Sequence, residues 1–335
     1  MDLLTQGLLG GALASAAANR EEARRAAFVG FGAALLADAD VFIGSPGDPL
    51  LKLEFHRHFT HALIFIPVGA LVAALLLWLL LRQQLGFARV YRYALLGYAT
   101  SGLLDACTSY GTHLLWPFSD ERIAWSIIAI IDPLFSLALL VGLAAGFYSR
   151  KAWPARLGLG LAGVYLAAGL WQHHGALDAA RELAAQRGHP VDRMLVKPTL
   201  ANLVLWRSVY RSGDRYYIDA IRVGTSSRRV YPGLSMPAFA PQRDLPQLPA
   251  DSVLAEDLRR FDALSDGYVV RDSSREQVLS DIRYAMLPTS AAPMWGIEID
   301  PSRPSQHAAF NVYRDAPANH RALFLAMLRG RDLPD

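Results

Sequence analysis

Residues 56–81 read HRHFTHALIFIPVGALVAALLLWLLL, three histidines within six residues followed by an uncharged apolar run. The run from Ala62 to Leu81 has about twenty residues, the length that a helix needs to cross a hydrocarbon layer of ~30 Å. This stretch predicts a membrane-spanning helix whose beginning carries a cluster of histidines. We therefore expect a polar functional site at a membrane surface.

The three histidines of this stretch have carboxylates near them in the sequence, Asp38 and Asp40. Imidazole is the commonest metal ligand near neutral pH, and together with carboxylates it suits a divalent cation. We interpret the cluster as a metal site, because such clustering is rare by chance in a chain with nine histidines among 335 residues. The alternative is a polar collar at the membrane interface, formed by His56 and His58 with the neighbouring cations.

Helix geometry limits which of these histidines can share one ion. Residues five apart are turned by about 140° around a helix, so His56 and His61 meet only if His56 lies in the preceding loop. We prefer this arrangement, with His61 in the first helical turn and with Arg57 and Thr60 as neighbouring or substrate-phosphate contacts. His58 and His61, three residues apart, are the alternative pair.

Several blocks of the sequence resemble a known family. Residues 36–40 (LADAD) and 56–62 (HRHFTHA) resemble the D-x-D … H-R-x-x-T-H-S signature of the YdjM-type bacterial inner-membrane metal-dependent hydrolases. Residues 103–112 (LLDACTSYGT), 114–119 (LLWPFS) and 131–134 (IDPL) resemble later segments of that family. The resemblance covers roughly the first half of the chain and implies a membrane-bound hydrolase that uses a metal ion.

Residue types and resemblance together indicate five metal ligands, namely Asp38, Asp40, His56, His61 and Asp105. This chain departs from the family pattern at two positions. Ala62 stands where serine is usual, and Ser101 stands where many members carry a histidine four residues before the second-block aspartate. If that histidine is a ligand elsewhere, the site here must be completed otherwise, for instance by His113.

The carboxylates require different local geometries. Asp38 and Asp40 would point to nearly opposite sides of a helix, so a shared role needs extended backbone there, and we expect Asp38 rather than Asp40 as the ligand. Asp105 and Thr108, three apart, would form one polar face beside the ion, with interhelical hydrogen bonding in lipid as the alternative. Asp132 needs no role as a ligand or catalytic group, because it is expected to be the N-cap of a helix that starts with proline.

Composition divides the chain into two predicted domains. Residues 1–175 are dominated by Ala, Leu, Gly and Val and predict a membrane α-helical bundle, whereas residues 176–335 are rich in Arg, Asp, Pro and Ser and predict a small soluble α+β domain with an antiparallel sheet. The net charge of +3, without a basic block interleaved with aromatics, argues against nucleic-acid binding. The single cysteine, Cys107, excludes an internal disulfide and a cysteine-rich zinc site.

About six apolar segments are expected to form the membrane domain. They run over Leu3–Ala18, Ala26–Ala37, Thr60–Leu81, Tyr93–Ala106, Ile123–Tyr148 and Leu157–Trp171. The second and fourth are shorter than a normal span and are bounded by aspartates, which predicts a buried polar site inside the bundle. The first lacks a positive n-region and is interpreted as a retained membrane segment.

Basic residues follow the first, third and fifth segments: Arg20, Arg24 and Arg25, then Arg82, Arg89 and Arg92, then Arg150, Lys151 and Arg156. If six segments alternate, all three connections face the same side, which the positive-inside rule assigns to the cytoplasm. The metal motifs and the C-terminal domain are then expected on the outer, periplasmic side of a bacterial inner membrane.

In the second half, we predict a helix from His173 to Gln186 and a hairpin in which residues 203–206 and 216–218 flank a turn at 212–214. Further strands are expected at 268–270, 282–286, 295–299 and 310–313, and helices at 251–264 and 318–328. Residues 231–249 contain five prolines and are interpreted as a long connection. No phosphate loop, nucleophile elbow or H-E-x-x-H motif is present in this half.

The sequence thus predicts an integral-membrane metal-dependent hydrolase that acts on a phosphoester or lipid-linked substrate. Zinc is the expected ion, with manganese or magnesium as alternatives, and Arg57, Asp105 and Thr108 are the expected catalytic residues. A metal-dependent amidase or peptidase, or a metal-stabilised scaffold that presents the C-terminal domain to an envelope partner, remain alternatives. A transporter is disfavoured by the large soluble tail and by the lack of an inverted repeat.

Overall fold

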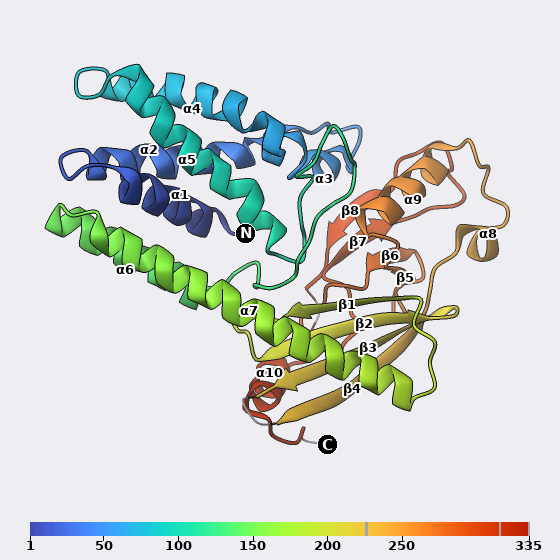
Figure 1. Ribbon diagram of the computed structural model, residues 1–335. Helices are drawn as coiled ribbons and strands as arrows, with labels where there is room; N and C mark the ends of the chain where they lie inside the picture. The colour runs from blue at the N-terminus through green and yellow to red at the C-terminus, as the bar shows by residue number, and fades with distance from the viewer. Residues whose placement is uncertain (225–226, 315, 334–335) are drawn as a thin grey trace. The chain divides into compact units, whose positions relative to one another are not determined.

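The computed structural model describes residues 1–224, 227–314 and 316–333 and divides into two units (Figure 1). Unit 1 comprises Met1–Ile43, Phe55–Trp171 and Leu200–Leu203, and unit 2 comprises Gly44–Glu54, Gln172–Thr199 and Val204–Asp335. One boundary lies near residue 171, close to the expected division at 175. Residues 44–54, which the composition groups with the helical part, belong to unit 2.

Unit 1 is built from helices. They are α1 (Leu3–Ala17), α2 (Ala23–Leu36), α4 (Ile66–Leu81), α5 (Phe87–Ala106), α6 (Pro133–Ser149) and the first part of α7 (Trp153–Gln186), with the 3₁₀ turns η1 (Ala37–Phe42), η2 (Phe59–His61) and η3 (Leu63–Phe65). In Figure 1, α1, α2, α4 and α5 lie side by side, and α5 packs against each of the other three. Alanines fill much of the core between them, so the helices approach closely.

The helices of unit 1 run alternately between two ends, and one end is basic. Arg24, after α1, donates to the carbonyl of Phe147 at the end of α6 at 2.6 Å. Arg25 donates to Gln84, after α4, at 2.9 Å. The three basic connections therefore meet at one end of unit 1. Asp38, on η1 directly after α2, and Asp105, in the last turn of α5, lie at the opposite ends of these helices, about 20–30 Å away at a rise of 1.5 Å per residue.

Among the described residues, one helical stretch, Leu63–Leu81, is long and apolar enough to cross a membrane. Large apolar side chains along it are about half exposed, including Leu71, Leu75, Leu76, Leu79 and Leu80. An apolar face of this size is typical of a surface that contacts lipid or a partner. Helices form in all six predicted apolar segments, but α1 and α6 are shorter, so six membrane crossings stay a prediction.

Two predicted helix boundaries are wrong. The segment expected from Ile123 to Tyr148 is helical only from Pro133, because Asp132 caps the helix by accepting from the N–H of Phe135 at 3.3 Å. The separate helix expected to begin at His173 is instead the second part of α7, which runs unbroken from Trp153 to Gln186. No proline interrupts this stretch after its first turn, so the two predicted pieces form one helix.

Unit 2 contains two antiparallel four-stranded sheets. The first has the order β1 (Arg193–Pro198), β2 (Leu205–Ser212), β3 (Arg215–Val223) and β4 (Arg228–Pro237), and the second has the order β5 (Val269–Arg271), β6 (Val278–Asp281), β7 (Trp295–Glu298) and β8 (Ala309–Val312). The helices of this unit are α3 (Leu51–Phe55), α8 (Pro241–Asp244), α9 (Val253–Leu264) and α10 (His320–Arg329), besides the end of α7. The alanines of α7 pack on Trp206 and Ile221 of the first sheet, and Leu258 and Phe261 of α9 pack on the second.

The predicted α+β character of the second half is confirmed, as is the hairpin of β2 and β3, whose two-residue turn begins with Gly213 at φ 61°. The strand expected at 282–286 is wrong. The chain turns there because the carboxylate of Asp281 accepts from the N–H and the guanidinium of Arg283, and β6 ends at Asp281. Residues 231–237, expected in a connection, belong to β4. This strand lies at the edge of the sheet, where proline, which has no N–H, can be accommodated.

Candidate metal centre

Four segments of unit 1 bring the five predicted ligands together. Asp38 and Asp40 lie on η1 directly after α2, His61 ends η2, and Asp105 lies in the last turn of α5. His56 lies in the turn that follows α3. The two aspartates of η1, His61 and Asp105 are all buried, whereas the side chain of His56 is 29% exposed. The fold therefore brings the residues of the sequence motifs into one cluster, and this cluster is open to solvent at His56.

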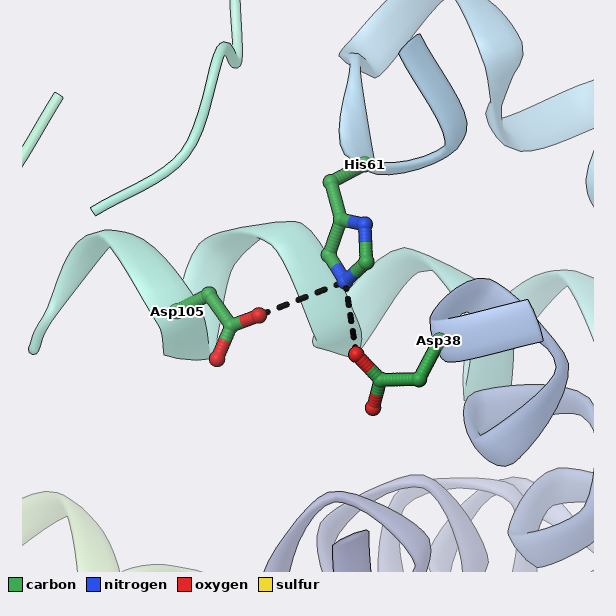
Figure 2. A group of neighbouring side chains, drawn as sticks. All are labelled: Asp38, His61 and Asp105. Carbon is green, nitrogen blue, oxygen red and sulfur yellow. Dashed lines mark ion pairs between the residues drawn. The ribbon is translucent and has the colours of Figure 1, made fainter. Parts of the chain in front are cut away.

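Figure 2 shows His61 between two carboxylates that come from different helical segments. Its Nε2 lies 3.4 Å from Oδ1 of Asp38 and 3.2 Å from Oδ2 of Asp105. Two donor atoms on one tetrahedral ion, each ~2.1 Å from it, would lie about 3.4 Å apart. The spacing of these three side chains fits a shared metal ion.

The hydrogen bonding of this group supports the same interpretation. Both carboxylate oxygens of Asp38 and Nε2 of His61 are buried, and none of them makes a hydrogen bond to the described residues. A buried polar atom without a partner costs about 1–3 kcal/mol, and more when it is charged. A bound cation would supply the interaction that these atoms lack.

A second group joins the same cluster. Ligand atoms of Asp38, Asp40 and His56 all lie within 4.8 Å of one another, and Nδ1 of His56 is 3.1 Å from Oδ1 of Asp40. The carboxylate of Asp40 also accepts from the N–H of Arg57 and the hydroxyl of Thr60, both at 2.8 Å. Asp38 belongs to both groups, so the cluster has enough donors for one or two ions.

The extended backbone expected at Asp38 and Asp40 is not observed, because residues 37–42 form a 3₁₀ helix. Positions two apart are separated by about 160° on an α-helix but by about 120° on a 3₁₀ helix. The tighter turn is one reason why both carboxylates can reach the same cluster.

Electrostatics concentrate negative charge at this point. Burial alone would raise the pKa of Asp40, but hydrogen bonds from His56 and His61 hold it well below its usual range. Three carboxylates face His61: Asp38 and Asp105 lie 3.4 and 3.2 Å from its Nε2, and Asp40 lies 3.3 Å from its Nδ1. These carboxylates favour a positive charge next to the imidazole.

Arg57 lies beside the cluster and is 5% exposed. Its Nε is 3.0 Å from Oδ2 of Asp105, its Nη2 donates to the carbonyl of Met1 at 3.0 Å, and its guanidinium lies 5.2 Å from the ring centre of Tyr110. Its φ of 60° is uncommon for a non-glycine residue, and such backbone strain clusters at functional sites. The hydroxyl of Thr112 holds this conformation by donating to the Arg57 carbonyl at 2.9 Å.

Other residues considered from the sequence lie away from the cluster. Thr108 lies beyond the end of α5, and its hydroxyl donates to the carbonyl of Asp105 at 2.8 Å, so the expected helical face of the two side chains does not form. The rings of His58 and His113 lie 4.7 Å apart and belong to neither ligand group. The alternative pair of His58 with His61, and completion of the site by His113, are therefore not supported. Ser101 donates instead to the carbonyl of Ala34 on α2 at 2.9 Å.

Three contacts of the site were not predicted. Gln6 of α1 donates to Oδ2 of Asp105 at 3.1 Å, and the amino group of Met1 contacts the same carboxylate. The hydroxyl of Tyr98 donates to the carbonyl of Thr60 at 2.8 Å and so positions η2. A buried glutamine in an apolar helix is a signal that sequence inspection could have used, because polar side chains in such helices are usually functional.

A third acidic group lies in unit 2 and has a different character. Ligand atoms of Asp48, Asp257 and His307 lie within 4.8 Å of one another. The guanidinium of Arg260 already binds this group, donating to Asp48 at 2.9 Å and to Asp257 at 3.0 Å. Because an arginine supplies the positive charge, these carboxylates do not need a metal ion.

The fold and the cluster define a membrane protein with a candidate metal centre in its helical unit. A sequence model of the YdjM inner membrane protein family matches residues 1–176, and the chain belongs to this family. The family resemblance seen in the sequence motifs is confirmed, and membership indicates the bacterial inner membrane as the location.

Two curated relatives are similar to parts of the chain. The inner membrane protein YbcI of Escherichia coli (strain K12) is 34% identical over 112 residues, which cover 32% of this chain and 62% of YbcI. The uncharacterized protein YfhP of Bacillus subtilis (strain 168) is 24% identical over 180 residues, which cover 51% of this chain and 53% of YfhP. The chain thus spans less than two thirds of either relative. No solved structure matches it.

Proposed function

We propose that this protein is a metal-dependent hydrolase that cleaves a phosphoester in a lipid or lipid-linked substrate. The observation that supports the proposal most directly is the buried group of Asp38, His61 and Asp105, in which both oxygens of Asp38 and Nε2 of His61 make no hydrogen bond to the described residues. Mixed carboxylate and imidazole donors suit zinc, and manganese or magnesium are the alternatives.

When bound, a divalent ion supplies Lewis acidity and an activated water at neutral pH. The residues of the chain would provide the remaining functions. His56, whose side chain is 29% exposed, lies at the open edge, where a substrate can enter. Asp40 orients His56 through its 3.1 Å contact with Nδ1. An open edge favours a catalytic role over a scaffold, because structural ions are enclosed by protein ligands.

Arg57 would bind the charged oxygens of the phosphoryl group. Its Nη1 and Nε are buried and make no hydrogen bond to the described residues. Nε forms an ion pair with Asp105 at 3.0 Å, and Nη2 donates to the carbonyl of Met1. The stacking on Tyr110 and the two engaged nitrogens fix the plane of the guanidinium. A residue that merely anchors the helix to lipid headgroups would not need this burial.

The Arg57→Lys variant tests the phosphoesterase proposal. Lysine keeps the charge but cannot reproduce the planar set of donors, so we expect normal metal content and a turnover of lipid phosphates that is lower by about 100-fold. Hydrolysis by wild type and variant should be compared at equal metal loading, on a panel of lipid phosphates and on amide substrates. Equal rates would indicate an anchor, and a wild type that cleaves only amides would replace the phosphoesterase by an amidase.

The basic end of unit 1 predicts the orientation in the membrane. The positive-inside rule assigns the connections after α1, α4 and α6 to the cytoplasm, so the metal centre and unit 2 would face the periplasm. Exposed glutamines supply matched probes: Gln247→Cys in unit 2 should react with a membrane-impermeant maleimide in intact spheroplasts, and Gln83→Cys after α4 should react only after lysis. The reverse pattern would overturn the orientation.

A further inference from the structure

A pocket lined by residues of unit 2 contains none of the residues of the metal centre and takes no part in the proposed hydrolysis. Its volume of about 220 Å³ is below the ~300–1,000 Å³ that is usual for sites of drug-sized ligands, so it fits a small molecule. Apolar side chains such as Leu254 and Ile299 form part of its wall. The polar part of the wall consists of Gln277, Glu298, Asp300, Arg303, Gln306 and His307.

His307 is held in one orientation by a buried carboxylate. Its Nδ1 lies 3.0 Å from Oδ2 of Asp257, and Asp257 is fully buried. The same carboxylate accepts from Arg260 at 3.0 Å and from the N–H of Ala308 at 2.8 Å. Because this carboxylate acts as an acceptor toward all three groups, Nδ1 of His307 must be the donor.

In the neutral ring, a proton on Nδ1 makes Nε2 an acceptor. Nε2 is on the opposite edge of the ring from Asp257 and makes no hydrogen bond to the residues that the structure describes. His307 lines the pocket, and its side chain is 37% exposed. When the ring is neutral, Nε2 is therefore the acceptor that the pocket presents to a ligand.

The two carboxylates of the pocket differ in whether a cation pairs with them. Asp300 forms an ion pair with Arg303 at 3.2 Å. Glu298 accepts from the side-chain amide of Asn311 at 3.1 Å, but no cation among the described residues pairs with it. The wall thus combines the exposed carboxylate of Glu298, with which no described cation pairs, and an imidazole nitrogen that accepts in the neutral ring. A ligand that complements it carries a positive charge and hydrogen-bond donors.

We propose that this pocket binds a small hydroxylated ammonium compound, such as an amino sugar, with its ammonium group at Glu298 and a hydroxyl donor at Nε2 of His307. A purely structural role explains part of the same cluster, because Arg260 links α9 to Asp48 and Glu54. That role accounts for Asp257 and Arg260. It leaves the open edge of His307 and the charge of Glu298 without a function.

The test uses D-glucosamine as the probe and D-glucose as the neutral comparison, with the full chain in detergent and saturation-transfer NMR to measure binding. We expect glucosamine to bind at least tenfold more tightly than glucose. His307→Phe and Glu298→Gln should each weaken glucosamine binding about tenfold or more. The matched controls are Glu256→Gln, at an exposed position, and His320→Phe, at a partly exposed position outside the pocket; both should leave binding unchanged.

Three results would overturn the proposal: no binding of glucosamine, equal binding of both sugars, or wild-type affinity in both pocket variants. Circular dichroism establishes that each variant is folded, and the Glu298→Gln change alone decides the matter if His307→Phe does not fold. The outcome is independent of metal binding in unit 1, so failure here leaves the proposed hydrolase untouched.

Discussion

The His61→Ala variant is expected to lose its bound metal while it remains folded in detergent. Nε2 of His61 faces Asp38 and Asp105, so removal of the imidazole takes away the donor that joins the two carboxylates. Loss of a residue that only orients a ligand typically costs 10- to 100-fold in metal affinity, and we expect more than 100-fold for a ligand itself. Elemental analysis of purified protein gives the metal stoichiometry, and far-ultraviolet circular dichroism gives the fold.

His58→Ala is the matched control. His58 lies three residues before His61, but its ring packs on His113 and Trp116, so the metal content of this variant should equal that of the wild type. Asp105→Asn should behave as His61→Ala does, since it removes the charge at nearly constant volume. Full metal content in both ligand variants would exclude these residues from the site, and a wild type without affinity for divalent ions would refute the metal centre.

Asp38→Asn separates a metal ligand from a structural carboxylate. The buried oxygens of Asp38 accept no hydrogen bond from the described residues, so removal of its charge should not lower the free energy of unfolding measured without metal. In the wild type, metal at 100 times its Kd should add about 2.7 kcal/mol to that free energy, and the variant should lose this gain. An equal gain in both proteins would contradict the assignment.

The second large effect is expected at Gly97 of α5. A Cβ at this position would overlap the carbonyl oxygen of Gly30 on α2, and backbone cannot yield as a flexible side chain does. We expect Gly97→Ala to destabilise unit 1 by about 3 kcal/mol, at the upper end of overpacking effects. Because α5 carries Asp105 and α2 leads to Asp38, the displaced helices should also weaken metal binding.

Gly163→Ala in α7 is the control, since a Cβ there meets no atom within 4 Å. The same substitution should be neutral or should stabilise the protein by up to about 1 kcal/mol through helix propensity. Thermal unfolding in detergent compares the two variants directly. Equal unfolding temperatures would show that the close approach of α2 and α5 is not needed.

Features that depend on neighbouring residues were predicted from the sequence. The apolar run after His61, the cap of Asp132 on a helix that starts with proline, and the turn at Gly213 are local signals, and the structure contains all three. The candidate ligands were also predicted, because histidines and aspartates in short motifs stand out in an apolar chain. The structure then brings these five side chains to one place.

Features that depend on distant contacts were not predicted. Residues 282–286 have the composition of a strand, but the pairing of Asp281 with Arg283 turns the chain before them. Proline at 232 and 237 suggested a loop until the sheet order placed β4 at an edge. In both cases the hydrogen-bond partners of the backbone decide whether a strand forms. The sequence of one segment does not show which other segment will supply these partners.

The sequence by itself determined a membrane protein with apolar helices, a family membership and a set of candidate metal ligands. Only the tertiary structure decided that Asp40 joins Asp38 in the cluster, that Arg57 rather than Thr108 lies beside it, and that Arg260 fills the third acidic group. The physical reason is the sequence separation of the residues that interact. Apolar runs, caps and turns depend on residues a few positions apart, whereas a buried charge is tolerated only beside a partner that the fold brings from far along the chain.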